Sequence, residues 1–107
     1  MLIDEIKTSL RIGKSNISFD DDEIVPLIDA ARHELMISGI IPGKVLKDIS
    51  ASKIDGKELD PLVKRAITVY VKANFGWDNP EADRFQASFE SLKNHLSLSA
   101  EYTGEVS

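Results

Sequence analysis

Apolar residues recur at helical spacing in four stretches of the chain, and turn-forming residues separate these stretches. In residues 2–12 the apolar positions fall four apart, with Asp4 and Glu5 near the start. This pattern predicts a short amphipathic helix that ends at Gly13.

In the second stretch, the acidic run 20–23 precedes an apolar stripe that extends from Ile24 to Met36. Carboxylates stabilise a helix at its amino end, so we expect a helix that these residues cap, with Pro26 in or just past its first turn. A start as early as Asp20 would instead predict a kink at the proline. Gly39 and Pro42 are expected to end this helix.

Two further helices are expected in the carboxy-terminal half. Asp60 and Pro61 are typical of a helix start, and the helix that follows is expected to end at Gly76. Asn79 and Pro80 repeat the same start signal, and the apolar positions from Ala82 to Leu96 then alternate in steps of three and four. Such a narrow stripe suits packing against one antiparallel neighbour, so the third and fourth helices should form an αα-hairpin.

Residues 40–58 are the least regular part of the chain. Pro42-Gly43 and Asp55-Gly56 mark turns, yet several apolar residues between them need cover. Either a helical turn near residues 44–49 packs this segment back onto the core, or it is a working loop that finds cover on a partner. Residues 53–57 are also compatible with the tip of a small hairpin.

Together these patterns predict an all-α fold, a small bundle of about four helices with a long irregular loop between the second and third. We expect residues 1–97 to form one domain and residues 98–107, which lose helical periodicity, to form a flexible tail. The predicted core consists of Leu27, Ile28, Ala31, Leu35, Leu62, Ala66, Ile67, Tyr70, Phe85, Phe89, Leu92 and Leu96.

Composition narrows the class of protein. Of the 107 residues, 42% are hydrophobic and 29% charged, and no apolar run approaches the roughly 20 residues that span a bilayer. The first residues lack the features of a secretory signal, so we expect a cytoplasmic location. There is no cysteine, which excludes disulfides and thiolate sites. The net charge of -5 argues against a protein that binds nucleic acid mainly through phosphate contacts.

Candidate chemistry is sparse, and we expect neither an enzyme nor a cofactor or metal site. His33 has no second histidine four residues on, and His95 lies in another predicted helix. The run Asp20-Asp21-Asp22 lacks the spacing and the glycine of a calcium loop. The basic positions Arg32, Lys64, Arg65 and Lys72 are compatible with a helix-turn-helix surface, but a solvated face fits the net charge better.

The densest aromatic feature is Phe75-Gly76-Trp77, at the predicted turn between the third and fourth helices. At least one ring should anchor this turn in the core, and an exposed second ring would be typical of a protein interface.

An ordered series of segments resembles one known family. The segments lie at residues 60–67, 70–76, 78–80, 84–85 and 89–93, with further similarity upstream at 21–24, 27–28 and 30–31 and downstream at 96–99. In this order and at this chain length they resemble the head-tail connector family of tailed bacteriophages and prophages, and they cover nearly the whole chain.

The resemblance implies a structural protein of the virion that assembles, in the host cytoplasm, as a dodecameric ring beneath the portal protein. Such a ring extends the DNA channel and contacts the next head-completion or tail protein, and DNA passes through it without specific binding. No membrane is involved. An acidic lumen would repel the DNA backbone and let it slide.

Two sets of interface residues are expected, one in the irregular loop because its apolar residues need cover, and one in the carboxy-terminal segment because of the resemblance. Subunit contacts are expected at Ile40, Ile41, Val45, Leu46, Ile49 and Ile54, in the irregular loop. The family's carboxy-terminal segment, which orders on the portal, corresponds to Leu98–Val106, with Leu98 and Tyr102 as apolar anchors. On this view, replacing Tyr102 with alanine weakens portal binding and leaves the melting temperature nearly unchanged. The alternative function is a small helix-turn-helix DNA-binding regulator, and a small enzyme is the third.

Overall fold

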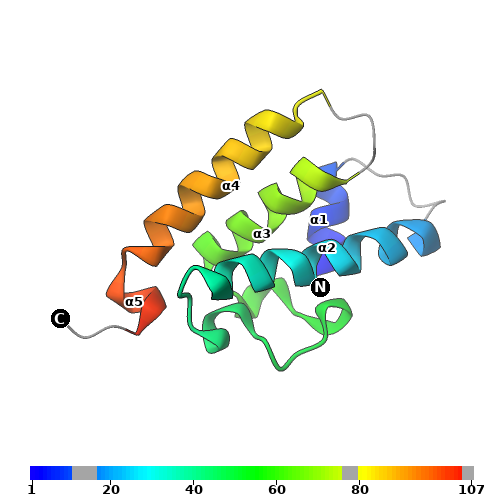
Figure 1. Ribbon diagram of the computed structural model, residues 1–107. Helices are drawn as coiled ribbons and strands as arrows, with labels where there is room; N and C mark the ends of the chain where they lie inside the picture. Colours follow the sequence, from blue (N-terminus) through cyan, green and yellow to red (C-terminus); the bar gives the residue numbers. More distant parts are fainter. Residues whose placement is uncertain (11–16, 76–79, 105–107) are drawn as a thin grey trace.

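The computed structural model describes residues 1–10, 17–75 and 80–104, and of residues 17–22 it describes the helical backbone alone. The described residues form α-helices and 3-10 helical turns, with no strand among them (Figure 1). The predicted all-α class is confirmed. In chain order the elements are α1 (Leu2–Leu10), α2 (Ile17–Ile37), the 3-10 turns η2 (Pro42–Val45), η3 (Ala51–Lys53) and η4 (Gly56–Glu58), α3 (Pro61–Asn74), α4 (Ala82–Ser97) and α5 (Ala100–Thr103).

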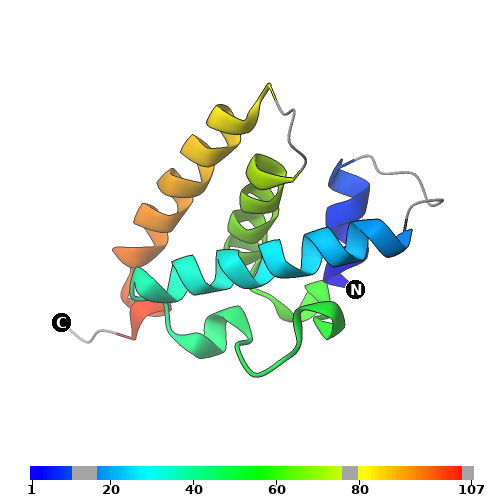
Figure 2. The same ribbon diagram turned by 45° about the vertical axis from the view of Figure 1, so that its right-hand side comes forward.

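Helix α3 is the central element, because it packs against α4, α2 and α1. Figures 1 and 2 show α3 and α4 side by side and antiparallel, as the sequence predicted for these two helices, while α2 crosses α3 on another side. The segment with the three 3-10 turns runs below α2 in both views. The 3-10 turns in turn pack on α1 and α2, and α5 packs on α4.

The start of α3 follows the predicted chemistry. The Asp60 carboxylate accepts hydrogen bonds from the backbone N–H groups of Leu62 at 2.9 Å and Val63 at 3.4 Å, and Pro61 occupies the first helical position. The buried residues of the helix are spaced by three and four, which aims them at one face. They are Val63, Ala66, Ile67 and Val71.

Helix α2 begins earlier than the acidic run suggested. It starts at Ile17, so residues 20–23 lie within its first turns instead of capping it from outside, and Pro26 is inside the helix. Pro26 is exposed, and it has no N–H to donate within the helix. Gly39 ends the helix in the left-handed conformation, with φ of 103°, as expected.

The irregular segment between α2 and α3 covers its own apolar residues. Ile40, Val45, Ala51, Ile54 and Leu59 are all buried in the core of the same chain. The alternative in which the segment packs back on the core is therefore the observed one. No hairpin forms at residues 53–57; instead the Asp55 carboxylate accepts a hydrogen bond from the Lys57 N–H at 3.0 Å and caps η4.

Most of the predicted core residues lie in or against the observed core. Ile28, Ala31, Leu35, Ala66, Ile67, Phe89 and Leu96 are buried, and Leu27, Leu62, Tyr70 and Leu92 are half-buried against them. Phe85 differs: it is only half-buried and does not join the cluster. The side chains of Lys72 and Arg84 cover its ring, with the Lys72 Nζ 5.1 Å from the ring centroid.

The turn between α3 and α4 was predicted from residues that are only partly described. Phe75 is half-buried against the core, whereas Gly76, Trp77 and Asn79 lie outside the described residues. Helix α4 itself starts at Ala82, after Glu81. The predicted glycine cap of α1, Gly13, also lies outside the described residues.

Helix α1 contacts the rest of the fold through both its apolar and its polar face. Leu2 and Ile6 are fully buried, and the Leu2 N–H donates to the Ile54 carbonyl at 2.8 Å. On the polar side the Glu5 carboxylate accepts from the Lys64 ammonium of α3 at 3.0 Å. The same carboxylate lies against Gly56, where a Cβ atom would stand 1.7 Å from the Glu5 Oε2.

Replacing Gly56 with alanine is therefore expected to lower the free energy of unfolding by about 1 kcal/mol, because the added methyl group forces the Glu5 carboxylate away from Lys64. The displaced group is the end of a flexible side chain, which limits the cost. Denaturant unfolding of a double-mutant cycle with Glu5→Ala checks this. In the Glu5→Ala background the glycine substitution should cost about 0.5 kcal/mol less, and full additivity would contradict the contact.

Candidate functional site

The surface of the segment between α2 and α3 holds two open hollows on either side of the Pro42-Gly43 turn. We call the larger one the Asp60 hollow; its volume is about 480 Å³, and Ile41, Gly43, Lys44, Glu58, Leu59 and Asp60 line it. The smaller one, the Ile49 hollow, has a volume of about 240 Å³, and Pro42, Gly43, Leu46, Lys47, Asp48 and Ile49 line it. Both hollows lie in the segment from which subunit contacts were expected.

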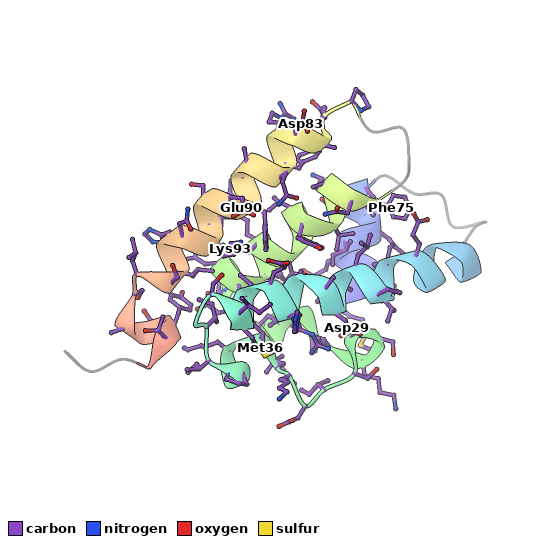
Figure 3. All side chains as sticks on the ribbon, in the orientation of Figure 1. Asp29, Met36, Phe75, Asp83, Glu90 and Lys93 are labelled. Atoms are coloured by element: carbon purple, nitrogen blue, oxygen red, sulfur yellow. The ribbon has the colours of Figure 1, made fainter. Side chains whose placement is uncertain are left out.

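Arg32 of α2 holds the backbone beneath the Ile49 hollow. Its guanidinium, which is 6% exposed, donates from Nη1 to the carbonyl oxygens of Leu46 at 2.7 Å, Ile49 at 2.9 Å and Val45 at 3.4 Å. Its Nη2 donates to the Asp29 carboxylate, and Figure 3 labels Asp29 on α2 above this segment. A planar fork with several donors suits such a set of acceptors better than a lysine ammonium would.

The backbone of Leu46 is strained in this arrangement. Its φ of 53° places it in the left-handed region, which residues other than glycine and asparagine seldom adopt. Strained residues persist only where their surroundings hold them, and they cluster at functional positions. The three carbonyl contacts of Arg32 supply that hold at Leu46 and its neighbours.

The Asp60 hollow is bounded by a second long-range polar contact. The Tyr102 hydroxyl of α5 donates to the Asp60 carboxylate, with both oxygens at 2.9 Å, while the same carboxylate caps α3. The Ile41 N–H donates to the Tyr102 carbonyl at 2.9 Å, and the Lys44 Nζ lies 5.4 Å from the centroid of the Tyr102 ring. Tyr102, which is 6% exposed, thus docks α5 on the core, whereas the sequence predicted a flexible tail from residue 98. Residues 105–107 lie outside the described residues.

Burial and the contact with Asp60 together raise the pKa of Tyr102 from its ordinary value of 10.0 to about 12. The neutral phenol is the form that the fold favours. The stabilisation that the neutral Tyr102 phenol gives the fold is therefore complete below about pH 10 and is lost as the pH rises from 10 toward 12.

We expect the free energy of unfolding to fall across this pH range more steeply in the natural chain than in a Tyr102→Phe variant, which has no phenol to titrate at this position. Urea unfolding at several pH values between about 9 and about 11 measures both slopes. The Tyr102→Phe chain controls for lysine titration in the same range. Equal slopes would show that the phenol titrates as it does in water.

The expected interface residues divide into two groups. Ile40, Val45 and Ile54 are at most 2% exposed, so they belong to the core of the subunit and not to its surface. Ile41 lines the Asp60 hollow, and Leu46 and Ile49 line the other. Of the two expected portal anchors, Leu98 is 88% exposed and Tyr102 is buried.

The two histidines and the basic positions were the candidates for chemistry in the sequence. His33 and His95 are exposed on different helices, and among the described residues no group of three or more histidine or acidic side chains could hold a metal ion. The basic positions do not form one surface either. Arg32 is buried, Lys64 binds Glu5 and Lys72 covers Phe85, while Arg65 is exposed.

The roles of Arg32 and Asp60 in holding distant segments together were not predicted from the sequence. Arg32 lies four residues after Ile28 and three before Leu35, so its position on the buried stripe of α2 was a signal that it is covered. Asp60 was recognised as a helix cap, but its bond to a residue 42 positions later has no local signal.

A family model described as "Phage connector protein" matches residues 2–103 of the chain. The match includes all the helices described above. No curated protein and no solved structure gives a significant match. In the described ranges, no helix has both the length and the apolar character that crossing a bilayer requires.

Proposed function

The chain belongs to the phage connector protein family, and on that premise we propose that it is a head-tail connector of a tailed phage or prophage. In this proposal it assembles as a dodecameric ring under the portal protein, extends the DNA channel and joins the head to the next head-completion or tail protein. Its role is structural, and its place is the head-tail interface of the virion.

The observation that carries the proposal is the family match over residues 2–103, which leaves only a few residues of the chain unmatched. The surface is compatible with such a role. Arg32 and Asp60 hold the segment between α2 and α3 in one conformation, and a surface that is ordered before binding loses less conformational entropy on assembly.

A closed ring requires two different contact patches on each subunit, because every copy meets one neighbour with each patch. The exposed parts of the segment between α2 and α3 are our candidates for one patch, and in particular Ile41, Leu46 and Ile49 at the two hollows. Ile40, Val45 and Ile54 support these residues from beneath.

Contact with the portal is assigned to the carboxy-terminal turn. Tyr102 is buried against the chain's own core, so its side chain would reach a portal only after α5 leaves Asp60. The outer face of α5 offers Glu101 without such a rearrangement. DNA passes through the ring without specific binding, and the net charge of -5 per subunit favours a lumen that repels phosphates.

The test is the solution mass of the purified chain, measured by light scattering across a wide concentration range, with negative-stain images of the largest species. We expect closed rings, either alone or after addition of the portal protein of the same phage. An unrelated acidic helical protein of similar size is the control for crowding effects. A strict monomer both with and without the portal would contradict the proposal.

A further inference from the structure

Leu98 is the most exposed large apolar side chain in the described part of the chain. It is 88% exposed, compared with 68% for Ile37 and 51% for Met1. Its backbone is ordered on both sides, because the Leu98 N–H donates to the His95 carbonyl at 3.3 Å and the Ser99 N–H donates to the Leu96 carbonyl at 3.1 Å. Leu98 is therefore an exposed apolar side chain on an ordered backbone, which we call the knob, and it lies at the junction of α4 and α5. Figures 1 and 2 show this junction of the two helices at the left.

The Ile49 hollow offers an apolar seat for such a knob. Leu46 and Ile49 line it and are half-buried, and the Arg32 contacts fix the backbone of both residues. Its volume of about 240 Å³ is sufficient for one aliphatic side chain. Leu98 does not fill the hollow of its own chain, since it remains almost fully exposed.

The charges around the knob and the hollow are complementary. Lys47 and Asp48 line the hollow and are exposed, while His95 and Glu101 flank Leu98 and are also exposed. Within the described residues none of these four side chains forms an ion pair. A neighbouring copy can therefore place Glu101 near Lys47, and a pair of opposite charges at the rim favours one orientation of docking.

We infer that Leu98 of one copy inserts into the Ile49 hollow of the next copy, with Glu101 beside Lys47 at the rim. The contact joins two different patches, so each copy offers one knob and one hollow and the arrangement can repeat around a ring. This inference rests on the proposed assembly and deepens it. It reassigns Leu98 and Glu101 from the portal to the neighbouring subunit, so the portal contact falls to Tyr102 once α5 leaves Asp60.

The absence of cysteine makes disulfide cross-linking a clean test. A chain with Leu98→Cys and Asp48→Cys should form a ladder of covalent oligomers on mild oxidation. A mixture of the two single variants should form heterodimers, and neither variant alone should form the same species. The matched control combines Asp48→Cys with Ser91→Cys, an exposed position two turns earlier on α4, and should give no ladder.

Charge reversal tests the rim independently of cysteine. Lys47→Glu or Glu101→Lys alone should raise the concentration needed for half-assembly roughly fivefold, and the two together should restore it. Leu98→Asp should raise it more than about tenfold while leaving the circular dichroism spectrum unchanged.

Four outcomes would overturn the inference. Oligomers in solution without a ladder, or cross-linking of Leu98→Cys to itself, would remove this contact and leave the proposed function standing. Cross-linking of Leu98→Cys to added portal protein in place of a second copy would assign the knob to the portal. A chain that stays monomeric with and without the portal would remove the proposed function, and this contact with it.

Discussion

Replacing Tyr102 with alanine is expected to lower the free energy of unfolding by about 3–5 kcal/mol, a large part of the stability of a domain of this size. The substitution removes a buried aromatic ring and the hydroxyl that donates to the Asp60 carboxylate. It also leaves an unfilled space under Ile41 and Lys44. Denaturant unfolding followed by far-UV circular dichroism measures the change.

Tyr102→Phe is the matched control, because it keeps the ring and removes only the hydroxyl. It should cost about 1.5–3 kcal/mol, the range for a hydrogen bond to a charged group. The sequence alone suggested that this residue lies in a flexible tail, and a Tyr102→Ala chain as stable as the natural one would restore that interpretation. A loss in Tyr102→Phe equal to that in Tyr102→Ala would mean that the ring contributes nothing.

Replacing Arg32 with methionine should have an effect of similar size, about 3–5 kcal/mol. Methionine fills much of the space but leaves the carbonyl oxygens of Leu46 and Ile49 without their donor in a buried setting. Without that donor, Leu46 has less to hold it at a positive φ. Hydrogen exchange should show faster exchange in residues 42–50 even where the rest of the chain keeps its protection.

Asp29→Asn separates the role of the carbonyl contacts from that of the ion pair. The Asp29 side chain is 55% exposed, so its charge is screened and its loss should cost less than about 1 kcal/mol. The loss of stability in Arg32→Lys should lie between those in Arg32→Met and Asp29→Asn, because an ammonium keeps the charge but not the fork of donors. If Arg32→Met were no worse than Asp29→Asn, the carbonyl contacts would not be what holds this segment.

Local chemistry was sufficient to predict most helices. Asp60 and Pro61 predicted the start of α3 because capping involves neighbours in sequence, and the steps of three and four in α4 predicted its packing on one helix. The start of α2 was missed because an acidic run is compatible both with a cap and with the first turns of a helix. The backbone hydrogen bonds that would decide between these alternatives leave no pattern in the sequence.

The candidate site was less predictable because distant residues build it. Apolar residues in the segment between α2 and α3 indicated a need for cover, but the same pattern fits cover by the chain itself and cover by a partner. Which one applies depends on Arg32, whose partners lie 13–17 positions later, and on Tyr102, whose partner lies 42 positions earlier. The pattern therefore could not distinguish two groups of residues. The first group lines the hollows and comprises Ile41, Leu46 and Ile49, and the second is buried and comprises Ile40, Val45 and Ile54.

The Asp60 carboxylate has two sets of partners, which are synthesised at different times during translation. The carboxylate can cap α3 as soon as Leu62 and Val63 are made, but its hydroxyl partner is synthesised 42 residues later. During synthesis the Asp60 carboxylate can therefore cap α3 before its bond to the Tyr102 hydroxyl can form. A premature stop codon anywhere before Tyr102 would release a subunit without this bond, which cellular proteases could remove before it joins an assembly and blocks its completion.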